Sequence, residues 1–212
     1  MTTTEKPEQK DQDRSARGGR SLTNLSIGIV VVLVGLAVIV GMNSGSSSSS
    51  SVDSPAPLAA STPTHVSVPS ISADSSLVAT GLQPDGSLAV PPVSQPMQAS
   101  WFDGSPTPGS VGPAVILGHI NGNGQPGIFA NLDKVTAGAE VVVDRADGQR
   151  AIFQVSRVDV IPKSSFPTDS VYNDTPNSQL RLITCGGQYD RANRNYLSNV
   201  IVYADLIDVQ HV

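Results

Sequence analysis

The chain has 212 residues and a formal net charge of −5, and residues 1–24 carry five Lys or Arg against four Asp or Glu. The remaining eight Lys or Arg are outnumbered by fourteen Asp or Glu and form no basic stripe, which argues against a nucleic-acid partner. Nineteen Gly, sixteen Pro and short valine-rich runs indicate one all-β domain with many turns.

Residues 25–42, LSIGIVVVLVGLAVIVGM, have no charged side chain and predict one transmembrane helix. Eighteen residues at about 1.5 Å each reach about 27 Å, close to the thickness of the hydrocarbon core of a bilayer. A signal peptide is the alternative, but no convincing small-x-small cleavage site follows. Arg14, Arg17 and Arg20 precede the span and no Lys or Arg follows it until Lys134. The positive-inside rule therefore predicts a single-pass protein of the cell membrane, with a cytoplasmic N-terminus and an extracellular domain.

Polar sequence flanks this span on both sides. Residues 1–24 mix charges of both signs and are predicted to form a disordered cytoplasmic tail. Residues 43–64 are rich in Ser, Pro and Ala and predict a flexible linker, with an r.m.s. length of about 25 Å for a coil of about 22 residues. The folded extracellular domain is expected to occupy residues 65–212.

Strand signals recur through this domain and turn residues separate them, while no internal repeat is visible. The predicted elements, in chain order, are a hairpin over 65–82, a strand over 114–118 that ends at His119, strands within 133–162 around the turn at Asp147-Gly148, one short helical turn within 163–174, a strand over 180–184 that ends at Cys185, and a last strand over 199–207.

Cys185 is the one cysteine of the chain, so an internal disulfide is excluded. A lone cysteine is most often a small buried hydrophobic residue, and a lone histidine is most often structural. His119 and Cys185, however, each follow a predicted strand, and neighbouring strands of a barrel could present both side chains at one rim. A thiol beside a base is the arrangement for acyl transfer, and a following cation, Arg191 or Arg194, could stabilise the oxyanion.

Other uses of these residues fit the sequence poorly. One cysteine and one nearby histidine fall short of a tetrahedral metal site, so neither a metal nor another cofactor is expected. The glycine-rich segment after His119 lacks the lysine and the Ser or Thr of a phosphate-binding loop. No G-x-S-x-G motif indicates a serine nucleophile.

Three segments, AVILGHINGNGQPGIF, FPTDSVY and LRLITCGGQYDR, resemble in this order the sortases, membrane-anchored cysteine transpeptidases of Gram-positive bacteria. The similarity covers roughly residue 66 to the C-terminus. The TCGG sequence and the PG-x-F sequence after the histidine are similar to the class E/F branch of actinobacteria.

This resemblance implies a closed eight-stranded β-barrel and a set of roles. Cys185 would attack the Thr–Gly carbonyl of an LPXTG-like signal in secreted surface proteins and form a thioester. An amine of a peptidoglycan precursor or a pilin would resolve this thioester. His119 would act as acid and base, and Thr184 would help to line the oxyanion region.

The sequence departs from the family pattern at the arginine expected where the last strand starts, because Asn199 stands there. Arg194 or Arg191 would substitute from the preceding loop. We favour Arg194, which is nearer the strand, while Arg191 adjoins Asp190 and would pair with it; either arginine could also be a solvated loop charge. The alternative function is a non-catalytic anchored β-domain that binds the cell wall or a partner protein.

Overall fold

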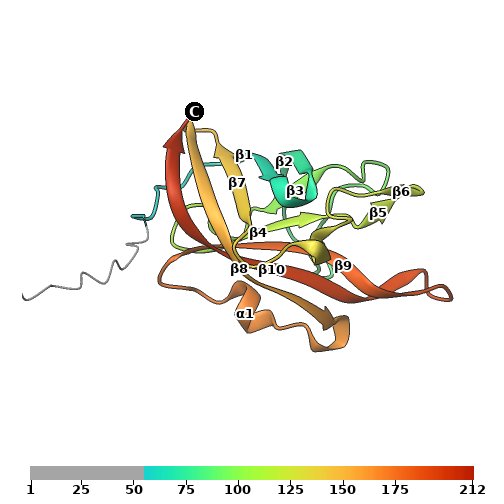
Figure 1. The fold of residues 1–212 in the computed structure, drawn as a ribbon. Coiled ribbons are helices and arrows are strands. Elements are labelled where there is room, and N and C mark those ends of the chain that lie inside the picture. The colour runs from blue at the N-terminus through green and yellow to red at the C-terminus, as the bar shows by residue number, and fades with distance from the viewer. Residues whose placement is uncertain (1–54) are drawn as a thin grey trace, which may run out of the picture. The chain divides into compact units, whose positions relative to one another are not determined.

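Strands are the main regular structure of this computed structural model, which describes residues 55–212. Within these residues the strands of the main sheet are β1 (Pro63–Val68), β2 (Ala73–Thr80), β3 (Ala99–Phe102), β4 (Gly112–Gly118), β7 (Glu140–Arg145), β8 (Gln149–Pro162), β9 (Ser178–Asp190) and β10 (Asn195–His211). They close a barrel in the order β1, β2, β3, β4, β9, β10, β8, β7 (Figure 1). The predicted all-β, eight-stranded closed barrel is therefore confirmed.

Shorter elements connect these strands. They are η1 (Pro69–Ile71), the small hairpin of β5 (Asn121–Gly122) and β6 (Gln125–Pro126), η2 (Leu132–Lys134), η3 (Lys163–Ser165) and α1 (Thr168–Tyr172). The short helical turn predicted within 163–174 is α1. In the described part of the chain no helix is both long enough and apolar enough to span a bilayer. The predicted tail and transmembrane helix, residues 1–42, lie outside the described residues.

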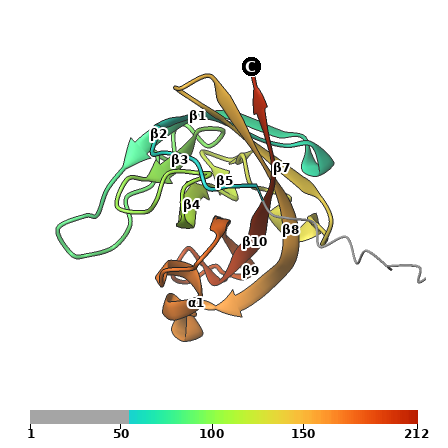
Figure 2. The ribbon, with the colours of Figure 1, turned by 90° about the vertical axis from the view of Figure 1, so that its left-hand side faces the viewer.

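The pairing of β4 with β9 is parallel, as is that of β2 with β3, and the other neighbouring strands pair antiparallel. A parallel pair needs a long crossover. Between β4 and β9 the chain first forms β7 and β8, which belong to the opposite wall of the barrel. It then returns to β9 through α1 (Figure 2). Residues far apart in sequence therefore lie side by side on β4 and β9.

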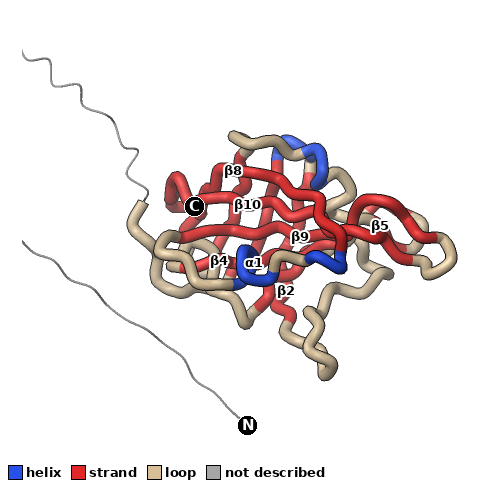
Figure 3. The backbone as a smooth tube through the Cα atoms, turned by 90° about the horizontal axis from the view of Figure 1, so that it is seen from below, coloured by secondary structure: helices blue, strands red, loops and turns tan. Residues whose placement is uncertain are grey.

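β4 is buried on both faces because the barrel core lies on one side and α1 covers the other. Ala114 and Ile116 belong to the main core, whereas Val115 and Leu117 pack outward with Val171 of α1 in a second apolar cluster. Figure 3 shows α1 lying across the neighbouring strands β4 and β9. The candidate site lies against this outer cluster, because Leu117 belongs to both.

The folded domain begins before the predicted boundary at residue 65. Leu58 packs against the core and its N–H donates to the carbonyl oxygen of Gly109 at 2.8 Å. The buried guanidinium of Arg145 donates to the carbonyl oxygen of Ala59 at 2.6 Å. The last part of the predicted linker 43–64 is therefore structured, because one leucine and one arginine fix a segment whose composition resembles a spacer.

β9 is also longer than predicted. It does not end at Cys185 but continues through Gly186 and Gly187 to Asp190, in a long hairpin with β10. Glycines weaken a strand in isolation, yet the hydrogen bonds to β10 hold this one. Cys185 is consequently fixed within a strand rather than at its exit.

Candidate active site

Parallel pairing brings His119 and Cys185 to the same level of the barrel. Leu117 of β4 pairs with Ile183 of β9, and His119 and Cys185 each lie two residues further along the chain. Leu117 and Ile183 both belong to the outer apolar cluster. Side chains two residues apart on an extended chain share a face, so both groups point to the outer side of the barrel. The structure thus brings both side chains to one outer face from neighbouring strands, although Cys185 lies within its strand and not at the strand end expected from the sequence.

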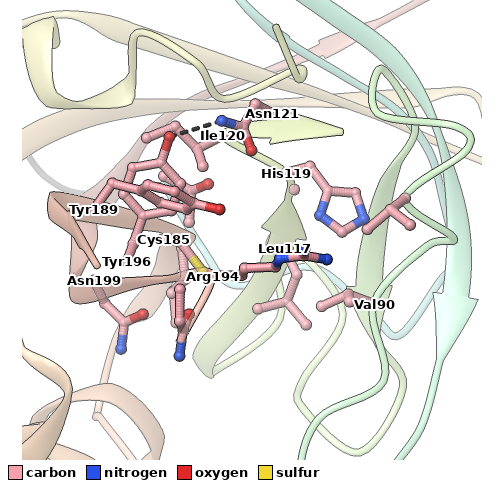
Figure 4. Close-up of a pocket in the computed structure, with 15 residues that line it drawn as sticks. Val90, Leu117, His119, Ile120, Asn121, Cys185, Tyr189, Arg194, Tyr196 and Asn199 are labelled. Carbon is pink, nitrogen blue, oxygen red and sulfur yellow. Dashed lines mark hydrogen bonds between the residues drawn. The ribbon is translucent and has the colours of Figure 1, made fainter. Parts of the chain in front are cut away.

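A cavity of about 360 Å³ lies over this outer face. Cys185 reaches it from β9, His119 from the end of β4, and Arg194 from the turn between β9 and β10 (Figure 4). Val90 and Leu117 contribute apolar walls. A thiol, an imidazole and a guanidinium therefore share one largely apolar hollow, which is the usual character of a ligand site.

One nitrogen of the His119 ring is engaged by the backbone. Its Nε2 lies 2.6 Å from the carbonyl oxygen of Pro91, in the connection from β2 to β3. A carbonyl oxygen can only accept, so Nε2 carries the hydrogen, and Nδ1 is the nitrogen of the neutral ring that can take a proton. Pro92 follows Pro91 and restricts it to extended conformations, which fixes the direction of the accepting carbonyl.

Cys185 is a free, half-buried thiol, and the residue paired with it on β10 is Asn199. Directly opposite residues of an antiparallel pair have Cβ atoms about 4.5–5.5 Å apart and face the same side. Asn199 also lines the cavity, and its carboxamide has no hydrogen-bond partner among the described residues. Its two N–H donors are therefore not engaged by another residue of the described chain.

A β-bulge follows the thiol. Gly186 pairs with Ser198 and Tyr189 pairs with Tyr196, so two residues of β9 face one residue of β10 between these pairs. Gly187 adopts φ = 71°, a region that side chains other than glycine rarely occupy. Because a bulge increases the local twist, it redirects the hairpin tip relative to the barrel strands.

The roof of the cavity consists of aromatic residues from this redirected tip. The rings of Tyr189 and Tyr196 lie 5.0 Å apart, centroid to centroid, in an edge-to-face arrangement. Asn121 of β5 donates from Nδ2 to the hydroxyl of Tyr196 at 2.7 Å (Figure 4). This hydrogen bond joins the hairpin tip to the chain that follows His119.

The arginine at the tip is positioned by a carboxylate. Asp190 accepts hydrogen bonds from the N–H of Ala192 at 2.8 Å, from the N–H of Asn193 at 3.3 Å and from Nδ2 of Asn193 at 2.8 Å. The side-chain bond from Asn193 is the main cause that lowers the pKa of Asp190 below its usual value. Arg194 follows with φ = 51° and lines the cavity.

Arg191 lies in the same turn, but it does not line the cavity. The expected pairing of Arg191 with Asp190 is wrong, because none of the ion pairs found in residues 55–212 includes Arg191, and turn N–H groups occupy the carboxylate instead. The structure thus separates the two arginines that the sequence left as candidates.

Some residues of the site were not anticipated from the sequence. Pro91, Tyr189, Tyr196 and the pairing of Asn199 with Cys185 depend on loop geometry and strand register, although the Pro-Pro dipeptide was a visible signal of a rigid loop. Over residues 55–212 no group of three or more His, Cys, Asp or Glu side chains is placed to hold a metal ion.

Comparisons with known proteins agree with this geometry. A family model described as Sortase domain matches residues 66–207. Streptococcus agalactiae sortase C1, in its complex with MTSET, is 23% identical, with a TM-score of 0.52 over 68% of this chain and 67% of that one. The lid mutant of Corynebacterium diphtheriae sortase A is 19% identical, with a TM-score of 0.53 over 71% of this chain and 73% of that one. Listeria monocytogenes sortase A is 15% identical, with a TM-score of 0.54 over 73% of this chain and 92% of that one. These structural likenesses show a shared fold, while a search of curated proteins found no significant match.

Proposed function

The chain belongs to the sortase family of cysteine transpeptidases, and from this premise we propose which reaction it performs and with which residues. The protein cleaves an LPXTG-like sorting signal of secreted surface proteins between Thr and Gly, through a thioester on Cys185. It then transfers the acyl group to an amine of a peptidoglycan precursor or a pilin.

The observation that supports this proposal best is the parallel register of β4 and β9. It places a thiol and an imidazole on one outer face, over a cavity of about 360 Å³, and leaves Nδ1 of His119 able to exchange a proton. Nucleophile and base held by rigid strands are what acyl transfer requires.

Nδ1 of His119 takes the proton of the Cys185 thiol. The thiolate attacks the Thr carbonyl carbon, and the carbonyl oxygen becomes an oxyanion. The C–N bond to Gly then breaks, and protonated His119 gives a proton to the leaving amine. In the second half the acceptor nitrogen attacks the thioester carbon, His119 takes the proton of that nitrogen, and the C–S bond breaks to release the thiolate.

Two side chains can stabilise the oxyanion. Arg194 supplies a positive charge from the hairpin tip, and Asn199 supplies carboxamide N–H groups from β10 opposite the thiol. Donors held in place before the reaction stabilise developing charge at little cost in reorganisation. We assign the cationic role to Arg194 and not to Arg191, because Arg194 lines the cavity.

The setting of the reaction is part of the proposal. The uncharged segment 25–42, with arginines before it, supports a single-pass anchor in the membrane of a Gram-positive cell and an extracellular catalytic domain. The TCGG sequence at Cys185 supports the class E/F branch of the family.

The test uses the full-length chain, wild type and Cys185→Ala, with a peptide that contains LPXTG. The wild type should release the Gly fragment, and mass spectrometry should detect the Thr-terminated acyl group on Cys185. Cys185→Ala should lose both while circular dichroism shows an intact fold, because alanine fills a half-buried strand position. A cleavage rate of Cys185→Ala within about tenfold of wild type contradicts the proposal, since loss of a covalent nucleophile cannot be so mild.

A further inference from the structure

A second cavity lies on the other side of the strand that carries the thiol. Side chains alternate along β9, so Thr184 and Gly186 face away from the side to which Cys185 points. Together with Phe129 and Asp133 they line a hollow of about 190 Å³, here called the rear cavity. The protein therefore has a cavity on each face of its proposed nucleophile strand.

The two cavities adjoin. Ile120 and Thr184 line both of them. The last paired residues of β4 and β9 are Leu117 and Ile183, so beyond this pair the strands no longer bond to each other. The two cavities are therefore neighbours at the point where the pairing of β4 with β9 ends.

The rear cavity contains an unused polar group. Thr184 is 4% exposed, and its Oγ1 has no hydrogen-bond partner in the part of the chain that the structure describes. Leaving a buried hydroxyl unpaired costs stability, so such a group points to a ligand that completes its hydrogen bonds.

The charge at the mouth of the rear cavity is negative. Asp133 of η2 is the charged residue among those that line it, and it is exposed. It takes part in none of the ion pairs found within residues 55–212. The adjacent Lys134 donates to Oδ1 of Asn131 at 2.8 Å, so its ammonium is engaged there. The remaining walls are mainly apolar, with Phe129, Val160 and Val200 among them.

We propose that the rear cavity admits the acceptor substrate, a primary amine at the end of an unbranched aliphatic chain. This inference rests on the proposed function. While the acyl peptide fills the cavity over Cys185, the second substrate needs another approach to the same thioester, and the proposed approach runs past Thr184, where the pairing of β4 with β9 ends.

Each feature of the rear cavity fits an amine. The carboxylate of Asp133 attracts the protonated amine, and the apolar walls then disfavour its charged form, so it loses a proton to Asp133 or water. The hydroxyl of Thr184 accepts a hydrogen bond from the neutral amine. The nitrogen attacks the thioester carbon, His119 takes its surplus proton, and the C–S bond breaks to release the thiolate of Cys185.

The experiment measures the ratio of transfer product to hydrolysis product, with full-length protein and an LPXTG peptide. The acceptors are Nα-acetyl-lysine amide, which is cationic near neutral pH, and hydroxylamine, which is uncharged there. For the lysine derivative, Asp133→Asn should lower the ratio about two- to fivefold and Asp133→Lys should lower it further, in keeping with one exposed charge pair. High salt should shrink both effects, because it screens exposed charges.

Asp174→Asn is the matched control, since Asp174 is also exposed but lines neither cavity. A steric variant, Ala130→Phe, narrows the rear cavity without changing charge and should lower transfer to both acceptors. The inference is overturned if Asp133→Asn leaves the ratio at the wild-type value, or lowers it equally for the uncharged acceptor. If the wild-type protein forms no acyl-enzyme at all, the proposed function itself fails, which is a separate result.

Discussion

His119 and Cys185 are held by the barrel, whereas Arg194 is held by a turn. The first two continue from strands with buried apolar side chains on both faces and a regular ladder of hydrogen bonds. Arg194 stands on an exposed hairpin tip, where a bulge and one carboxylate fix the backbone. Core packing thus positions the pair proposed to react, and local hydrogen bonds position the group proposed to stabilise charge. Substitutions at these positions should test this division.

His119→Ala should have the largest effect within this comparison. It should lower kcat/KM by about 10²–10⁴, the usual contribution of general acid–base catalysis, without unfolding the barrel. Peptide-cleavage kinetics and a thermal melt would measure the two quantities separately. A loss of activity that follows a matching loss of folded protein would mean that His119 is structural.

Arg194→Ala should lower kcat/KM by at least about 10², because loss of one donor to an oxyanion typically costs about 10²–10³ in kcat. Arg191→Ala is the matched control, since it removes the same charge from the same turn but from outside the cavity. A larger loss in Arg191→Ala would reverse the assignment. Losses below about threefold in both would leave the role to other donors.

Asn199→Ala should lower kcat by about tenfold, which corresponds to the low end of a hydrogen bond to a charged group, about 1.5 kcal/mol. Asn199→Asp should be worse, because it replaces the N–H donors by a negative charge opposite the oxyanion. Asn199 is positioned by a barrel strand. A tenfold loss of kcat in Asn199→Ala, together with only a small loss of kcat/KM in Arg194→Ala, would therefore shift the proposed stabilising role from the turn to the barrel. Equal kcat in Asn199→Ala and wild type would exclude Asn199.

Asp190→Ala should have the smallest effect, a loss of about threefold or less in kcat/KM, because it loosens the turn without removing Arg194. The lowered pKa of Asp190 means that its stabilisation of the turn is present above the usual value of 3.8 and is lost as pH falls through the lower folded value. The side-chain amide resonances of Asn193 should therefore titrate with a midpoint below 3.8. A midpoint at or above 3.8 would show that the carboxylate does not hold this turn.

The same division explains what could be predicted from the sequence. The apolar runs before His119 and Cys185 predicted strands, and their placement on neighbouring strands of a closed barrel is confirmed. The short strand β3 was missed, because its few residues lie in a segment rich in turn formers. Gly186 and Gly187 were interpreted as the end of β9, because the sequence does not reveal that β10 supplies hydrogen bonds on the other side.

The arginine could not be assigned for a related reason. Arg191 and Arg194 lie in the same turn, and which of them reaches the cavity depends on the backbone conformation of this turn, including the left-handed φ of Arg194, rather than on any pattern of residues. The position of Asn199 opposite Cys185 required the register of β9 and β10, which the bulge at Gly187 shifts. Side-chain periodicity carries no information on such a shift.

The segment before β1, which Arg145 holds through the carbonyl oxygen of Ala59, determines where tension on the chain would act first. Pro55 and Pro57 border a hollow together with Ser178, the first residue of β9. Seven residues of strand, at about 3.3 Å each, place Cys185 about 23 Å from that end. Tension applied to the chain at residue 55 would first load the hydrogen bond from Leu58 to Gly109 and that from Arg145 to Ala59, and only then the barrel. A pull from that side would thus strain contacts at the far end of β9 before it reaches the strand positions of the thiol and the imidazole.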